Sequence, residues 1–210
     1  MMELLLILIL LTDVALCSTG RLRVLVRTAA WQGFFLGLLA LCKGFTFHAA
    51  TLAAATIAVK AVIFPYILNR AIRKSGTLTE PLPYVSYNLS IVLCALMLGL
   101  CVLAADRLPS GQWRMAASIG FFTMFTGFFL IITRRTAFSQ VIGYLALEGG
   151  IYAFGLSLWQ EMQVEVEMGL LLDVFAAIFI MGIVIYRISS EFEHADTARL
   201  DFLNDSEEYD

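Results

Sequence analysis

Three ionisable side chains lie inside long apolar stretches of this 210-residue chain. Glu148 lies in the stretch 138–158, Asp173 lies in the next stretch, and Lys60 lies in an earlier one. A carboxylate near the middle of a bilayer costs roughly 2.5–3.5 kcal/mol on insertion scales. Charged groups held at such a cost commonly mark ion pathways, so these three residues are the first candidates for chemistry.

Glu148 lies between two tyrosines on one face of a predicted helix. Tyr144, Glu148 and Tyr152 are spaced i, i+4 and i+8, which places them in line along the helix. Close approach of another helix would remove water from the Glu148 carboxyl group and disfavour its charged form, so that it gains and loses protons near neutral pH. The alternative is a neutral acid that only hydrogen-bonds across helices for assembly. Small residues that would permit the close approach surround the acid: Gly143, Gly149, Gly150 and Gly155.

Asp173 is the second candidate proton carrier. Small residues share its helical face, namely Gly169, Ala176 and Ala177. It lies nearer the outer end of its helix than Glu148 does, and the alternative is a position at the membrane interface. Aspartate is too short to reach far towards water, which favours the role in ion transfer.

Lys60 lies somewhat past the middle of its stretch. Burial favours the neutral amine, so this lysine could hold and release a proton or modulate a neighbouring acid. It could instead extend to the interface or form a static ion pair. Pro65 removes a backbone donor and is expected to kink the helix. We expect Asp13, close to the inner end of the first stretch, to be solvated rather than functional.

The composition identifies a polytopic membrane protein. The chain is 60% hydrophobic and 15% charged, with a mean hydropathy of +0.84, whereas soluble domains average about 25% charged residues. It has no basic stripe suited to nucleic acid. The two histidines are far apart, and the four cysteines are expected to be buried apolar residues, so we predict no metal site, no cofactor and no catalytic cluster.

Long apolar stretches predict an all-α protein of about seven transmembrane helices, because lipid leaves no partner for an unpaired backbone. The first is interpreted as an uncleaved membrane helix, and the second has an alternative start near Val24. Lys and Arg in the loops predict an outer N-terminus and a cytoplasmic C-terminus. The predicted helices are 2–17, 29–42, 47–68, 87–105, 115–133, 138–158 and 168–188.

The longest hydrophilic connection, 69–86, divides these helices into groups. Residues 1–80 form a front part of three transmembrane helices, and residues 81–110 carry the fourth. Residues 111–190 form a core of three helices joined by short turns. Residues 191–210 form an acidic cytoplasmic tail.

Two runs in the three-helix core resemble the small K-type membrane subunit of respiratory complex I. They read RRTAFSQVIGYLALEGGIYAFGLSL and LLLDVFAAIFIMGIVIYRI. Arg134 and Arg135 match that subunit's arginine-containing loop, and Glu148 and Asp173 match the acids of its last two helices. The resemblance covers only the last three helices of this chain.

The whole chain resembles component E of hydrogenase-4, the Hyf-type family of group 4 membrane-bound nickel–iron hydrogenases and formate hydrogenlyase-like complexes. The stretch AVKAVIFPYILNRAIRK is similar to that family's front part. The resemblance implies a non-catalytic membrane-arm subunit of the cell inner membrane, beside antiporter-like subunits and indirectly linked to a hydrogenase peripheral arm. Its acids would carry protons or sodium. A structural scaffold and a C-type component of a multisubunit cation/proton antiporter are the alternatives.

Overall fold

The computed structural model describes residues 2–42, 47–75, 79, 83–105, 107 and 114–158. All of them belong to one compact unit that spans Met1–Asp173. The predicted last helix, 168–188, and the acidic tail, 191–210, lie outside the described residues, and so does Asp173.

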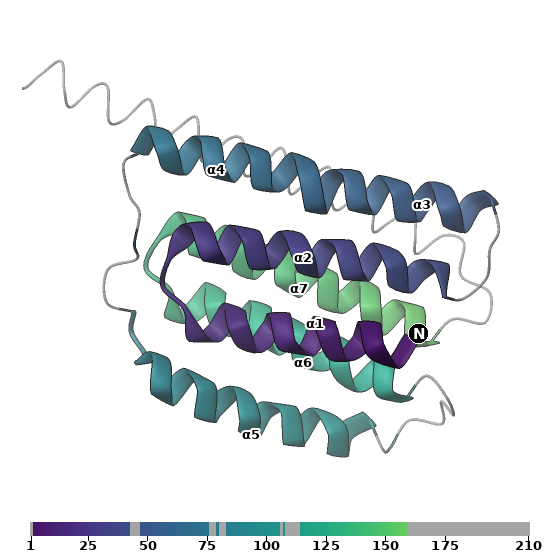
Figure 1. The fold of residues 1–210 in the computed structure, drawn as a ribbon. Helices are drawn as coiled ribbons and strands as arrows, with labels where there is room; N and C mark the ends of the chain where they lie inside the picture. Colours follow the sequence, from purple (N-terminus) through teal and green to yellow (C-terminus); the bar gives the residue numbers. More distant parts are fainter. Residues whose placement is uncertain are drawn as a thin grey trace, which may run out of the picture. The chain divides into compact units, whose positions relative to one another are not determined.

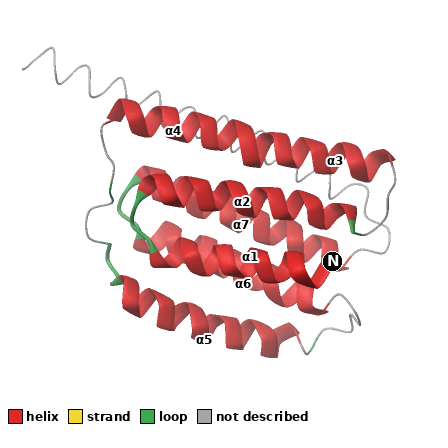
Figure 2. Cartoon of the chain, in the orientation of Figure 1, coloured by secondary structure: helices red, strands yellow, loops and turns green. Residues whose placement is uncertain are grey.

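Helices joined by loops make up the described part of the chain (Figure 1), and Figure 2 shows no strand among these residues. The all-α prediction is therefore confirmed for them, with one isolated backbone bridge between Arg21 and Thr79. The elements are α1 (Met2–Ser18), α2 (Leu22–Leu41), α3 (Phe47–Ile57), the π-helical segment η1 (Ala58–Ile63), α4 (Phe64–Ser75), α5 (Tyr87–Ala105), α6 (Arg114–Thr133) and α7 (Ala137–Leu158).

Three of these helices are long and apolar enough to cross a membrane, which indicates a membrane protein. They are Leu22–Leu41, Tyr87–Ala104 and Arg114–Thr133. The second predicted helix, 29–42, began too late, and its alternative start near Val24 is closer to the observed start of α2 at Leu22. Arg23 and Arg27 are exposed on this first part of α2, so the helix continues past both charges without burying either.

Helix α2 lies between two sets of neighbours. It contacts α3, η1 and α4 on one side and α1 and α7 on the other, and α5 packs on α1 and α6 (Figure 1). Side chains from α2 therefore reach both sets. Helix α2 therefore contacts buried polar residues on both sides, Lys60 of η1 on one and Asp13 of α1 on the other.

The most extensive helix–helix contact joins α6 and α7, and glycines make it possible. A Cβ atom added to Gly143 of α7 would lie 2.9 Å from the carbonyl oxygen of Gly127 of α6. One added to Gly120 of α6 would lie 2.7 Å from the Phe154 amide nitrogen. The expected close approach at Gly143 is thus confirmed, as small residues at membrane helix contacts allow. Gly155 is different, because no atom lies within 4 Å of its added Cβ.

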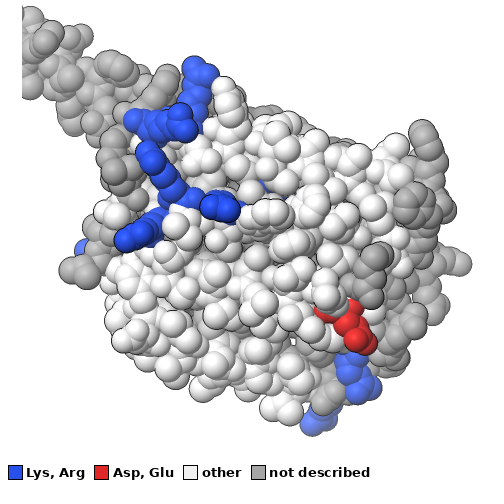
Figure 3. Space-filling view, viewed as in Figure 1, with Lys and Arg blue, Asp and Glu red and all other residues white. Residues whose placement is uncertain are grey.

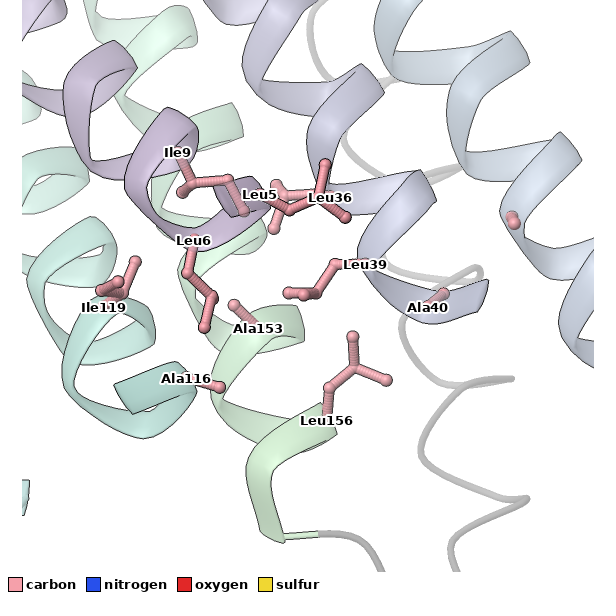
Figure 4. Packing of buried hydrophobic residues seen from close by; sticks show 11 residues of the cluster. Leu5, Leu6, Ile9, Leu36, Leu39, Ala40, Ala116, Ile119, Ala153 and Leu156 are labelled. Carbon is pink, nitrogen blue, oxygen red and sulfur yellow. The ribbon is translucent and has the colours of Figure 1, made fainter. Parts of the chain in front are cut away.

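One half of the bundle is filled by aliphatic side chains. They come from the first half of α1 and α6 and the second half of α2 and α7, as Figure 4 shows, together with Ala53 of α3. The packing of these side chains against one another removes their apolar surface from water. Its labelled members are Leu5, Leu6, Ile9, Leu36, Leu39, Ala40, Ala116, Ile119, Ala153 and Leu156.

Arg134, in the short connection between α6 and α7, is buried. Its Nη2 atom donates hydrogen bonds to the carbonyl oxygens of Leu16, at 3.3 Å, and Cys17, at 3.1 Å. The last carbonyls of a helix lack intrahelical partners and carry partial negative charge. A cation at this position donates the missing hydrogen bonds and offsets the charge. The guanidinium also lies 5.0 Å from the ring centroid of Tyr87. Arg134 thereby fastens the end of α1 to α5 and to the α6–α7 connection.

Candidate ion-handling site

The run from α3 to α4 contains a change of helical type. The Phe64 amide donates to the Val59 carbonyl, five residues back, which is the π-helical pattern of η1. Pro65 has no amide hydrogen to offer the carbonyl of Ala61, and a wider turn before it accommodates that loss. Single π turns inside α-helices are frequent at functional sites, and Lys60 lies in this one.

Lys60 lies directly against the backbone of α2. A Cβ atom added to Gly33 would be 2.5 Å from the Lys60 Cβ atom, closer than real Cβ atoms approach. Only glycine at position 33 permits this approach. The lysine side chain is therefore held at the middle of α2, where it has access to the helices beyond.

Lys60 and Glu148 form a buried ion pair. The Lys60 Nζ atom lies 3.2 Å from the Glu148 Oε1 atom, and the two side chains are 6% and 5% exposed. Glu148 lies near the middle of α7, and the adjoining Gly149 faces Leu36 of α2. Two candidates identified in separate apolar stretches are thus in direct contact.

The pair can exist in two forms. As ions, each group offsets the desolvation of the other, because either charge alone would be costly in this setting. The neutral form arises when a proton passes from the Lys60 ammonium group to the Glu148 carboxylate, since the two lie within hydrogen-bonding distance. Neither form adds net charge to the protein interior. A proton can therefore pass from one group to the other within this site without a change in net charge.

The two candidate tyrosines lie one turn before and one turn after Glu148 on α7. Tyr144 and Tyr152 are each partly buried. Tyr152 packs against the aliphatic cluster. Their part in proton movement stays a prediction, and Asp173 lies outside the described residues.

Asp13 forms a second buried polar site, and the prediction that it is solvated is wrong. Its exposed fraction is 0%. The Gln32 Nε2 atom of α2 donates to Asp13 Oδ1, and the Thr123 Oγ1 atom of α6 lies 2.6 Å from Asp13 Oδ2. Asp13 is near one end of α1, but α2, α5 and α6 all pack on that helix and exclude water from it.

The polar partners of Asp13 carried the signal that could have identified this site. Gln32 and Thr123 lie near the middle of apolar stretches, where a buried amide or hydroxyl needs a hydrogen-bonding partner. Which partner each would find depends on helix contacts that one sequence does not specify. Across the described ranges, no group of three or more histidine, cysteine, aspartate and glutamate side chains is arranged to hold a metal ion.

Together, the fold and the two sites indicate a helical membrane protein with ionisable groups buried among its helices. The chain is 31% identical over 194 residues to the uncharacterized protein Rv0085 of Mycobacterium tuberculosis, and the match covers 88% of this chain and 87% of that protein. The chain belongs to the same family as Rv0085. No protein-family model matches the chain, and no solved structure matches it.

Proposed function

We propose that this chain is a non-catalytic membrane-arm subunit of a complex I-related, membrane-bound nickel–iron hydrogenase of the hydrogenase-4 component E type. It contributes buried ionisable groups to a path for protons or sodium ions that is coupled to redox chemistry in partner subunits. The single observation that carries this proposal is the buried contact between Lys60 and Glu148. The resemblance of both surrounding stretches to that family adds to it.

Energetic reasoning favours a mobile proton over a purely structural ion pair. Replacing a buried ion pair by apolar side chains of similar volume is often neutral or stabilising. A buried ion pair among apolar helices therefore contributes little to stability. Ionisable groups inside membrane helices commonly serve transport. The π-helical backbone at Lys60 adds a second irregularity at the same place.

The proposed topology has seven transmembrane helices in the cell inner membrane, with the N-terminus outside and the C-terminus in the cytoplasm. Exposed arginines support the orientation, because basic loops stay on the cytoplasmic side. Figure 3 shows blue side chains gathered where α2 begins and α4 ends. The exposed arginines of this end are Arg21, Arg23, Arg27, Arg70, Arg73 and Arg135.

The proposed partners follow from the resemblance. Antiporter-like membrane subunits would lie on either side of this chain, and the peripheral arm would carry the metal centres. Asp173 would take the proton onward from Glu148, with Tyr144 and Tyr152 beside the route. This chain would hold no nickel, iron–sulfur cluster or flavin of its own.

Coupled ion transport in membrane vesicles tests the role of Glu148. The substitution Glu148→Gln keeps the side-chain shape and removes the charge. It should lower the stability of the chain because Lys60 loses its partner, but we expect the complex to assemble and coupled proton uptake to be lost. Ser157→Ala is the matched control, because Ser157 is also buried on α7 and donates within its own helix, to the Phe154 carbonyl. Normal uptake by an assembled Glu148→Gln complex would show that this residue carries no proton.

Purification of the tagged chain with its partners tests the family assignment. We expect mass spectrometry to identify hydrogenase large and small subunits together with antiporter-like subunits. Antiporter subunits without hydrogenase subunits would instead favour the C-type antiporter component. Loss of the complex on deletion, combined with normal transport in charge-neutral variants, would favour the scaffold.

A further inference from the structure

Asp13 differs from the ion pair because no described cation balances it. Gln32 faces it from α2, Thr123 from α6 and the Cys94 thiol from α5. No described lysine, arginine or histidine forms an ion pair with it, whereas Lys60 pairs with Glu148. Arg134, a buried cation at the end of α1, directs its Nη2 atom to the last carbonyls of that helix.

The Thr123 hydroxyl group can accommodate Asp13 with or without a proton. Its oxygen lies 2.6 Å from Asp13 Oδ2 and 2.8 Å from the Ile119 carbonyl oxygen. A hydroxyl has one hydrogen to donate and lone pairs that accept. When Asp13 is protonated, it donates to Thr123, and Thr123 donates to Ile119. When Asp13 is ionised, the Thr123 hydrogen turns to the carboxylate instead.

We infer that Asp13, Gln32 and Thr123 form a second proton-binding site, separate from the Lys60–Glu148 pair. Binding adds one proton to the Asp13 carboxylate and release returns it, with no change in oxidation state. The Thr123 hydroxyl hydrogen can turn to Asp13 or to the Ile119 carbonyl. Asp13 and Thr123 therefore stay hydrogen-bonded to each other whether Asp13 is protonated or ionised. Gln32 donates to Asp13 Oδ1 in both forms.

The second site adjoins the first through α2. Gln32 contacts Asp13, and the next residue, Gly33, faces Lys60. The two sites therefore lie at one level, on different faces of the same helix. On the basis of the proposed function, Asp13 extends the proton path from the Lys60–Glu148 pair towards α1 and α6.

Infrared spectroscopy of the purified full-length chain in lipid nanodiscs tests the inference across a pH series. The difference between the wild-type chain and Asp13→Asn isolates the carboxyl signal of Asp13. The amide that this substitution introduces would still donate to Thr123 and accept from Gln32, so we expect the variant to fold. The expected result is a carboxylic acid carbonyl band that converts to carboxylate bands as pH rises. An Asp13 signal that stays fully acid or fully carboxylate over the range in which the chain is folded overturns the inference.

A second variant keeps the acid in place. Thr123→Val should shift the Asp13 carbonyl band, because it removes the hydroxyl partner. Thr126→Val is the matched control, since Thr126 is also buried on α6 and its hydroxyl has no hydrogen-bond partner within the described part of the chain. An unshifted band in Thr123→Val would contradict the role assigned to the hydroxyl.

Vesicle transport separates this inference from the proposed function. If Glu148→Gln abolishes proton uptake but the Asp13 band does not titrate, the second site is wrong and the proposed function stands. If the band titrates while Glu148→Gln transports normally, Asp13 binds a proton and the proposed path through Glu148 is wrong. If both hold, Asp13→Asn should also lower coupled uptake, and normal uptake would remove Asp13 from the path.

Discussion

The two buried polar sites beside α2 solve the same problem in different ways. At one, the Lys60 ammonium and the Glu148 carboxylate balance each other. At the other, Asp13 is held by neutral donors from α2 and α6. Charge balance makes each member of the first site depend on the other. Hydrogen bonding makes the second site tolerant of a neutral substitute that donates and accepts at the same atoms.

The backbones of the two sites differ as well. The ion pair depends on a π-helical segment and on a glycine in the facing helix. The Asp13 site is formed by the regular α-helices α1, α2 and α6. Irregular backbone thus accompanies the site that brings opposite charges together. Substitutions at the two sites should therefore change the free energy of unfolding by different amounts and for different reasons.

The largest expected effect comes from breaking the ion pair on one side only. Lys60→Met leaves the Glu148 carboxylate buried without its cation and should lower the free energy of unfolding by about 3–5 kcal/mol. Combining it with Glu148→Leu should recover most of that loss. Unfolding of the purified full chain in detergent measures all three variants, and additive losses in the double variant would contradict direct pairing.

A smaller effect is expected from Gly33→Ala, which should separate η1 from α2. The added methyl group meets the Lys60 Cβ atom and should cost about 1–3 kcal/mol. Gly99→Ala on α5 is the matched control, because nothing lies within 4 Å of its added Cβ, and it should be neutral or stabilising by up to about 1 kcal/mol. The Lys60→Met cost should shrink in the Gly33→Ala background, and an unchanged cost would show that Gly33 does not position the lysine.

Substitutions of Asp13 should reveal dependence on hydrogen bonding and not on charge. Asp13→Ala leaves the buried Gln32 donor unpaired, while Thr123 can still donate to the Ile119 carbonyl, and should cost about 1–3 kcal/mol in unfolding free energy. Asp13→Asn should cost less than about 1 kcal/mol, because the amide can replace both bonds. Equal losses for the two variants would indicate that the negative charge itself stabilises the fold.

The smallest effect is expected from the threonines of α6. Thr123→Val removes one side-chain hydrogen bond in a membrane helix bundle and should cost roughly 0.6–1.7 kcal/mol. Thr126→Val should cost nothing or stabilise, since its buried hydroxyl lacks a partner among the described residues. Thermal unfolding of the two variants side by side gives the comparison, and a larger loss for Thr126 would contradict it.

The helices were the most predictable part of the described chain. Long apolar stretches predicted α1, α5, α6 and α7 to within one or two residues, because lipid and a polar backbone together leave few alternatives. The start of α2 was less certain, since Arg23 and Arg27 interrupt its hydrophobic pattern. The π-helical turn was not predicted, because Pro65 indicates a disturbed helix without specifying its form.

The candidate site was predictable residue by residue but not as an arrangement. Lys60 and Glu148 stood out because a charge in an apolar stretch is costly wherever it lies. Their contact depends on the approach of η1 to α2 at Gly33, which the periodicity of one helix cannot reveal. Asp13 was misjudged because distance from a helix end was taken as a measure of solvation, while neighbouring helices decide it.

In the proposed proton path, the shared level of the two sites has an electrical consequence. Moving one elementary charge through a membrane potential requires about 2.3 kcal/mol per 100 mV, in proportion to the depth crossed. Asp13 meets α2 at Gln32, and Lys60 meets it at Gly33, so a charge passing sideways between the sites stays at nearly one depth. Such a step does almost no work against the voltage. The membrane potential would therefore act on the steps that bring an ion to this level or carry it away, and the sideways exchange would proceed alike in energised and resting membranes.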